Sequence, residues 1–303
     1  MYLRIGGAIV MNPEKLAIRY RVTNGEKFSL KAHDPGDTAT WTSKKVASDA
    51  LQELIARSAQ LQDMLYAQDR WAVLLALQAM DAAGKDGLIK HVMSGVNPQG
   101  CDVVSFKVPS EQELQHDYLW RAACRLPERG HIGIFNRSYY EEVLVARVHP
   151  EVLQGQKLPP SLLTPDIWKE RFEDIRSFER HLVRNGTVVC KFFLNVSRKE
   201  QKKRFLERLE EPRKNWKFSP ADIRERAHWR QYMSAYEEMI RATSTPEAPW
   251  FVVPADNKWF TRLVVSSVIV HTLERLKLSY PEVSAAKRKD LVAASKLLRN
   301  SHA

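Results

Sequence analysis

The amino-acid sequence predicts a three-layer α/β fold built on a central parallel sheet. Short apolar runs typical of buried strands alternate along the chain with longer stretches of helical spacing, which is the order of a parallel sheet covered by helices on both faces. No repeat, low-complexity tract or linker interrupts the 303 residues, so one domain spanning residues 1–303 is expected. Residues 1–45 are expected to form an N-terminal arm, irregular from residue 11 onward because turn residues punctuate it.

Five strands and the helices between them follow in order. The strands are expected at residues 71–79, 102–108, 131–135, 187–196 and 250–254. The run at 187–196 is almost wholly apolar, the pattern of a strand covered on both faces. These strands supply the parallel sheet.

Helix signals lie between the strands. Residues 45–69 place apolar side chains on one helical face: Val46, Leu51, Leu54, Leu61 and Leu65. Ser110 and Glu113 form a capping-box pattern, which predicts a helix that ends before Pro127. Other helices are expected from the first strand's loop to about residue 96, from about residue 138, over 164–186 and 258–277, and after Pro281.

Residues 197–243 are predicted to form a helical lid. Helix starts at Ser197 and Ser219 bracket a highly charged helix, a break at Pro212 and a second long helix. Solvated helix faces account for about half of the basic residues in such a run. The position between the fourth and fifth strands also suits a lid whose arginines neutralise phosphoryl charge. Trp216 in this segment either covers a bound base or braces the lid.

The loop after the first strand predicts a phosphate-binding site. The usual pattern is Gly, four residues, Gly-Lys and then Ser or Thr. Here Gly84-Lys85 is kept, Ala79 stands at the first glycine, and Asp86 replaces the hydroxyl residue. Loop and helix N–H groups are expected to cradle the anion, and they belong to Ala82, Ala83, Gly84, Asp86 and Gly87. An ordinary strand-turn-helix is the alternative interpretation.

Asp81 argues for the phosphate loop over that alternative. A carboxylate inside an anion cradle is unfavourable unless a cation lies beside it. We therefore expect Asp81 to hold Mg²⁺, with Mn²⁺ as a possible substitute, or to orient an attacking phosphate.

A second constellation follows the third strand, at Phe135-Asn136-Arg137-Ser138-Tyr139-Tyr140-Glu141. Ligands of open α/β sheets bind beyond the carboxyl ends of the strands. Asn136 offers a neutral oxygen, Arg137 can clamp phosphate in a bidentate way, and Glu141 follows about one helical turn on. The alternative interpretation is a helix cap with a solvated arginine.

These residues resemble the polyphosphate kinase 2 family along nearly the whole chain. The most specific segments are Asp81 to Gly87, Gly95 to Gly100 and Phe135 to Glu141. The resemblance implies a P-loop kinase fold like that of thymidylate kinase, Mg²⁺-dependent phosphoryl exchange between polyphosphate and nucleotides, and a dimer or tetramer. Asn136 and Glu141 stand where many members carry aspartate and asparagine, which resembles the subgroup acting on both nucleoside mono- and diphosphates.

The resemblance also assigns roles to individual positions. It places Asp81, Lys85, Arg137 and Arg204 around the transferred phosphoryl group, with Asn136 and Glu141 in the same catalytic set. Basic residues beside the loop and lid would line a polyphosphate channel, and they are Lys90, Arg208, Lys214 and Lys217.

The net charge of +11 favours a polyanionic partner, for which nucleic acid, anionic lipid and polyphosphate all qualify. No run approaches the roughly 18 apolar residues of a membrane span, and no convincing signal peptide opens the chain. We therefore expect a cytoplasmic protein that starts at Met1 or Met11, with neither membrane nor nucleic acid as partner.

The leading functional hypothesis is a polyphosphate-dependent kinase that converts AMP and ADP to ADP and ATP. Two alternatives stay open: an ATP-dependent nucleoside monophosphate kinase and a non-catalytic polyanion-binding protein. The missing Ser or Thr after Lys85 and the positive charge count against the first. The grouping of Asp81, Lys85 and Arg137 counts against the second, because binding alone does not need all three.

Overall fold

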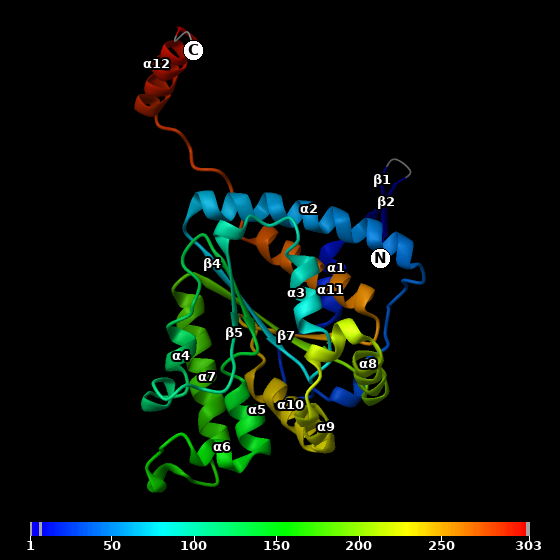
Figure 1. The fold of residues 1–303 in the computed structure, drawn as a ribbon. Coiled ribbons are helices and arrows are strands. Elements are labelled where there is room, and N and C mark those ends of the chain that lie inside the picture. The colour runs from blue at the N-terminus through cyan, green and yellow to red at the C-terminus, as the bar shows by residue number, and fades with distance from the viewer. Residues whose placement is uncertain (1, 6–7, 301–303) are drawn as a thin grey trace.

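A six-stranded sheet lies at the centre of the protein, for which a computed structural model describes residues 2–5 and 8–300 (Figure 1). The strand order is β3-β8-β7-β4-β6-β5, and every neighbouring pair is parallel except β3 with β8. The strands are β3 (Arg21–Val22), β4 (Ala72–Gln78), β5 (Cys101–Ser105), β6 (Ile132–Asn136), β7 (Thr187–Asn195) and β8 (Trp250–Pro254). The predicted central parallel sheet is confirmed.

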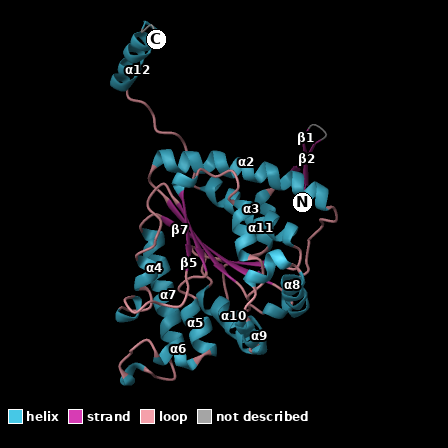
Figure 2. Ribbon diagram, in the orientation of Figure 1, coloured by secondary structure: helices cyan, strands magenta, loops and turns pink. Residues whose placement is uncertain are grey.

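Helices cover both faces of this sheet (Figure 2). One face carries α1 (Pro13–Arg19), α2 (Lys44–Gln68), α3 (Lys85–Val92) and α11 (Lys258–Arg275), which pack around α11. The other carries α5 (Glu141–Val148), α7 (Ile167–Arg184) and α10 (Trp229–Thr243). Because both faces are covered, every residue of β4 is buried, as its apolar sequence predicts. The three-layer prediction is confirmed.

The N-terminal arm is more ordered than predicted. Asn12 caps α1 by accepting a hydrogen bond from the Lys15 N–H, and Pro13 takes the first helical position. The helix buries Leu16 and packs on α11, and β3 then adds an antiparallel strand to the edge of the sheet. The expectation of an irregular segment was wrong there, because it overlooked the Asn-Pro helix start. A hairpin of β1 (Tyr2–Ile5) and β2 (Ala8–Met11) precedes it; Met1 lies outside the described residues.

The helix predicted from Ser110 does not form. The capping-box bonds are both present, at 2.7 Å from the Ser110 N–H to Glu113 and 3.3 Å from the Glu113 N–H to Ser110. They close only a 3-10 turn at Glu113–Gln115, because Asp117 accepts a hydrogen bond from the Leu119 N–H and starts a new turn. A single helical turn, α4 (Trp120–Ala123), follows.

Several element boundaries also differ from the prediction. The edge strand β5 ends at Ser105 rather than residue 108, and α3 ends at Val92 rather than residue 96. The helix predicted from Thr164 begins at Ile167. On α2 the predicted leucines are buried, but Val46 in the first turn is 41% exposed.

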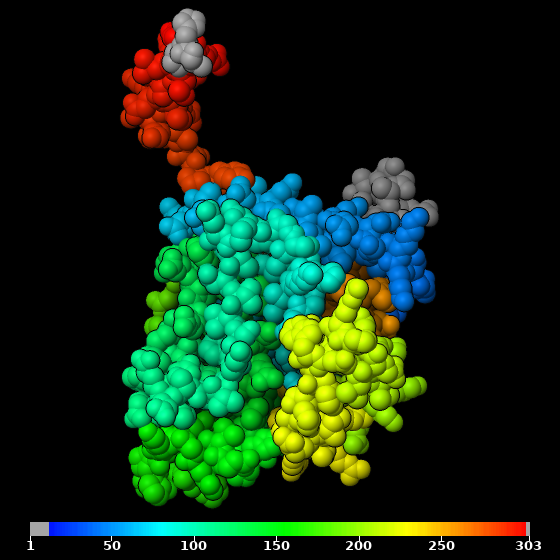
Figure 3. Space-filling model, viewed as in Figure 1, coloured from blue at the N-terminus to red at the C-terminus, as the bar shows by residue number. Residues whose placement is uncertain are grey.

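The lid segment, residues 197–243, is helical as predicted, with one further break. It comprises α8 (Arg198–Glu210), a 3-10 helix at Pro212–Lys217, α9 (Pro220–Ala227) and α10. Ser197 caps α8, and a capping box of Ser219 and Asp222 opens α9. The predicted second long helix is divided at His228 into α9 and α10. In the space-filling view the yellow-green residues of α8 and α9 lie beside α3 (Figure 3), whereas α10 packs against α5 and α7.

Two outer pieces complete the chain. The short helix α6 (Pro150–Gln154) follows α5, and the basic helix α12 (Ala285–Asn300) stands away from the body on an extended connection (Figures 1 and 3). Within residues 2–5 and 8–300, no helix combines the length and apolar character needed to span a bilayer.

We predict that Gly25→Ala destabilises the fold, which would show that the arm is an integral part of it. A Cβ at Gly25 would lie 2.1 Å from the backbone oxygen of Arg241 in α10, so the arm and α10 would have to separate. The expected loss of unfolding free energy is ~1–3 kcal/mol, measured by urea denaturation. Gly155→Ala is the control, because its Cβ would meet no atom closer than 3.5 Å. Equal stability of the two variants would contradict the prediction.

Candidate active site

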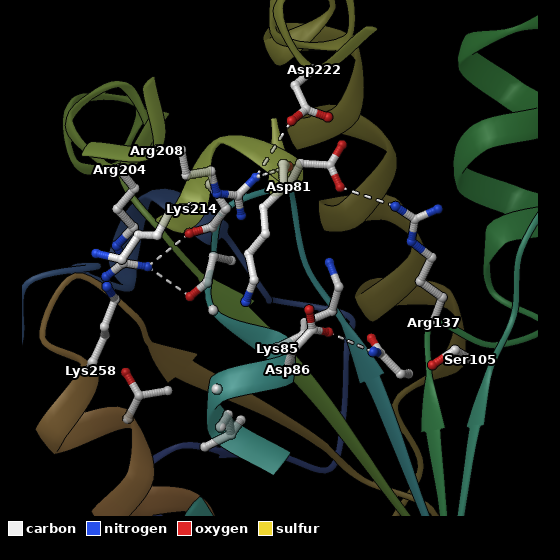
Figure 4. A pocket seen from close by; sticks show the side chains of 18 of the residues that line it. Asp81, Lys85, Asp86, Ser105, Arg137, Arg204, Arg208, Lys214, Asp222 and Lys258 are labelled. Carbon is white, nitrogen blue, oxygen red and sulfur yellow. Dashed lines mark hydrogen bonds and ion pairs between the residues drawn. The ribbon is translucent and has the colours of Figure 1, made fainter. Parts of the chain in front are cut away.

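A cavity of about 610 Å³ opens at the carboxyl ends of the parallel strands (Figure 4). Its walls come from the loop after β4, the ends of β5 and β6, the lid segment and the first turns of α11. Nine lysine and arginine side chains line it against four aspartate and glutamate side chains. Such an excess of positive charge in a cleft concentrates anions.

The phosphate loop has the backbone of an anion cradle. Gly84 takes φ +107° just before α3 begins, and Ala82 takes φ +60°. Any residue with a side chain would be strained at the φ angle of Gly84. The N–H groups in the first turn of α3 have no partner within the helix, so they can bind an anion. Lys85 donates to the carbonyl oxygens of Ala79 and Met80 at 2.8 and 3.4 Å. Burial lowers the pKa of Lys85, and the charge of Asp81 opposes that shift.

Asp81 and Arg137 meet across the mouth of this loop. The Arg137 guanidinium donates to Asp81 Oδ1 at 3.1 Å, and the two side chains are 42% and 30% exposed. Arg137 has φ +63°, held by a hydrogen bond from its N–H to the Leu77 oxygen. Because the pair is tied yet accessible, both charges can face a ligand. The alternative of a merely solvated arginine does not fit this pairing.

Asn136 and Glu141 lie on either side of Arg137. The Asn136 side-chain amide donates to Asp86 at 2.9 Å, which links the end of β6 to the first turn of α3. Glu141 opens α5; burial raises its pKa, while the charges of Arg137 and Lys85 oppose the shift. The structure therefore brings five of the six predicted catalytic residues together, namely Asp81, Lys85, Asn136, Arg137 and Glu141.

The contacts of Arg204 differ from its predicted role beside the transferred phosphoryl group. Its Nε donates to Glu200, and its two terminal nitrogens donate to the carbonyl oxygens of Ala82, Ala83, Ala255 and Asp256 at 2.6–3.1 Å. These bonds occupy all five guanidinium donors, and the residue is 3% exposed. In this arrangement Arg204 binds the back of the phosphate loop and has no donor left for a transferred phosphoryl group.

Three of the four predicted channel residues line the cavity, and one does not. Arg208, Lys214 and Lys217 line the cavity, with Arg208 paired to Asp222 at 3.5 Å and Lys214 paired to Glu211. Lys90 is exposed on α3 outside the residues that line the cavity, so its predicted place in the channel is not supported.

Trp216 also lines this cavity. It is 78% exposed, and the Lys217 ammonium lies 5.0 Å from its ring centroid. An indole this exposed makes too little contact to brace the lid. Of the two predicted roles, cover for a bound group remains.

Three basic residues of the cavity were missed by the sequence reasoning. Lys107 follows β5, whereas Lys258 and Arg262 stand on the first turns of α11, just after β8. All three lie beyond carboxyl ends of strands, where ligands of open sheets bind. Applying that rule to the second and last strands as well as the first and third would have identified them.

A divalent ion would find no preformed cage of side chains among the described residues. No group of three His, Cys, Asp or Glu side chains suited to a metal occurs in the part of the chain that the structure describes. Asp81 uses Oδ1 for Arg137, and its Oδ2 accepts no hydrogen bond from a described residue. One carboxylate beside an anion cradle fits Mg²⁺, which is commonly bound by one or two carboxylates and substrate phosphates.

Comparison with known proteins agrees with this geometry. The model of the family described as polyphosphate kinase 2 matches residues 41–281. The chain belongs to this family. It is 53% identical over 275 residues to an ADP-polyphosphate phosphotransferase of Rhodopseudomonas palustris, covering 90% of this chain and 95% of that protein. It is 46% identical over 275 residues to an AMP/ADP-polyphosphate phosphotransferase of Meiothermus ruber, covering 90% and 99%.

A solved structure of the same family shares the fold. The crystal structure of polyphosphate kinase 2 from Arthrobacter aurescens superposes with a TM-score of 0.85 at 38% identity, covering 95% of this chain and 99% of that one. The P-loop kinase fold implied by the resemblance is therefore confirmed, and the chain is a phosphotransferase of the polyphosphate kinase 2 family.

We predict that Arg204→Ala lowers the unfolding free energy by ~3 kcal/mol, because four backbone oxygens and Glu200 lose a buried charged partner. Arg208→Ala, one helical turn away and paired only to Asp222 and the Lys217 oxygen, should cost about 1 kcal/mol or less. Chemical denaturation of both variants measures the difference. Equal losses of unfolding free energy in the two variants would show that Arg204 does not stabilise the phosphate loop.

Proposed function

We propose that this protein is a polyphosphate-dependent nucleotide kinase that transfers phosphoryl groups to AMP and ADP. The observation that carries the proposal is the Asp81–Arg137 pair at the mouth of the phosphate loop, inside a cavity with nine basic residues. A cavity this basic suits a donor made only of phosphate. The names of the relatives from Rhodopseudomonas palustris and Meiothermus ruber support the donor and both acceptors.

The reaction needs positioning and charge neutralisation more than covalent help. A terminal phosphate oxygen of the acceptor forms the new bond to the terminal phosphorus of polyphosphate. The bridging P–O bond breaks, and polyphosphate leaves one residue shorter with the electron pair on its new terminal oxygen. Lys85 and Arg137 would stabilise the charge on the equatorial oxygens, and α3 would present its free N–H groups to the donor.

Mg²⁺ is part of this proposal, with Asp81 as its protein ligand through Oδ2. When bound, the ion would reduce repulsion between the two anionic substrates. The dimer or tetramer implied by the resemblance also stays a proposal, which light scattering on the purified protein would test.

The function is tested by incubating the purified protein with Mg²⁺, AMP and long-chain polyphosphate, and in parallel with ATP as donor. We expect ADP and ATP to form from polyphosphate much faster than from ATP. Lys85→Ala and Asp81→Asn should each lower kcat by at least ~100-fold while the circular dichroism spectrum stays unchanged. The absence of ADP with polyphosphate would refute the proposal, and turnover with ATP alone would favour a conventional monophosphate kinase.

A pH dependence follows from Glu141. Burial raises the pKa of its carboxyl group above the usual value of a glutamate, although the charges of Arg137 and Lys85 oppose the shift. If the ionised form keeps Arg137 in place, kcat falls as the pH drops through this raised pKa, earlier than for an exposed glutamate.

Glu141→Gln should remove this acid limb of the pH profile and lower the plateau of kcat by ~10-fold. Glu207→Gln is the control, since Glu207 is a more exposed carboxylate that lines the cavity. An acid limb that persists unchanged in Glu141→Gln would exclude Glu141 as its source.

A further inference from the structure

A buried carboxylate lies behind the active-site segment. Glu179 of α7 is 1% exposed and accepts hydrogen bonds on both oxygens. Its Oε1 accepts from the hydroxyl groups of Tyr139 and Tyr140 at 2.8 and 2.7 Å. Its Oε2 accepts from the ammonium group of Lys191 in β7 at 2.6 Å. Four side chains from three parts of the sequence thus converge on one point beside the interior strand β7.

Lys191 and its neighbours make further contacts in this cluster. Lys191 is 0% exposed and donates a second bond to the Thr243 oxygen at the end of α10. The Thr243 hydroxyl accepts from the Trp250 indole N–H at 2.9 Å. The Lys191 ammonium also lies 5.5–5.6 Å from the ring centroids of Tyr140 and Trp250. A buried ion pair with this many bonded partners holds its neighbours in one geometry.

The two tyrosines link this cluster to the reaction centre. They stand between Arg137, which pairs with Asp81, and Glu141, which opens α5. Burial raises the pKa of both tyrosines well above the usual value, so both hydroxyls stay protonated and can donate. On the other side of the segment, the Gln78 amide of β4 donates to Ser138 at 3.0 Å. Residues 136–141 are therefore anchored from two directions.

We propose that Glu179, held by Lys191, is a positioning residue for phosphoryl transfer: through Tyr139 and Tyr140 it fixes Arg137 and Glu141 against the phosphate loop. Glu179 does not line the cavity and touches no reacting group. Its hydrogen bonds to residues 136–141 are those from the hydroxyl groups of Tyr139 and Tyr140. The proposal rests on the proposed function for its chemistry, and on the hydrogen-bond geometry for its mechanism.

The test removes both hydroxyls and keeps both rings, as Tyr139→Phe with Tyr140→Phe. We expect kcat to fall at least tenfold and KM for polyphosphate to stay within twofold, because the basic cavity wall is untouched. Amide hydrogen exchange across residues 136–143 should become faster. Tyr20→Phe is the matched control, since Tyr20 is also buried and its hydroxyl donates to Asp37 at 2.9 Å; its kcat should stay within twofold.

A purely structural role would lower the unfolding midpoint and leave kcat per folded molecule unchanged, and that result would overturn the proposal. A double-mutant cycle gives a second criterion. In an Arg137→Lys background, removing the two hydroxyl groups should lower kcat by well under tenfold. If the effects of the two changes on kcat simply multiply, the tyrosines act independently of Arg137. If the double variant does not fold, Tyr139→Phe and Tyr140→Phe are measured singly against the same criteria.

Failure of the proposed function stays distinguishable. The kcat ratios are taken on whichever donor, polyphosphate or ATP, supports turnover in the wild-type protein. Wild-type protein without polyphosphate turnover refutes the function, while the ratios and the exchange rates of residues 136–143 still decide the role of Glu179. Unchanged exchange in the double variant would overturn that role whatever the substrate.

Discussion

The guanidinium group of Arg204 is the contact on which the site depends most directly. It joins the lid helix α8 to two loops, the phosphate loop after β4 and the loop between β8 and α11. A backbone carbonyl turned away from water needs a donor, and this one side chain supplies four of them. The φ of +60° at Ala82 persists in that setting because Arg204 fixes the carbonyls of Ala82 and Ala83 from behind.

This arrangement explains how the protein holds a cavity so rich in positive charge. Like charges close together repel, and water is partly excluded from the cavity. Each acidic residue of the cavity wall is paired with a neighbour: Asp81 with Arg137, Asp86 with Asn136, Asp222 with Arg208, and Glu207 with Lys203. These pairs reduce the repulsion and fix side-chain direction. No ion pair joins Lys107, Lys258 or Arg262 to a carboxylate of the described residues, so they remain available to a polyanion.

Much of the fold could be predicted because its signals are local. The apolar run that becomes β4 and the serine caps of α8 and α9 need only neighbouring residues to act. The failures have two origins: local signals that were overlooked or misjudged, as at Asn12 and Ser110, and pairing with distant segments. A capping box at Ser110 predicted a helix that Asp117 cuts short, and β3 forms only because β8 offers a sheet edge.

The site shows the same division. Spacing was enough to group Asp81, Lys85 and Arg137, since strand ends bring them to one edge of the sheet. The spacing of Arg204 and Arg208 along α8 could not reveal that one faces inward to the loop carbonyls while the other faces the cavity.

Two buried charged clusters therefore flank the point of transfer, and each holds a different half of it. Arg204 fixes the phosphate loop from the lid side, and Glu179 with Lys191 fixes residues 136–141 from beneath. The halves meet where Arg137 and Asp81 pair at 3.1 Å. Buried ion pairs add little net stability relative to apolar packing, yet breaking one is costly. In-line phosphoryl transfer between two anions tolerates little displacement of the positive groups that neutralise the anions. Buried charged clusters that fix the positions of such groups therefore suit this reaction.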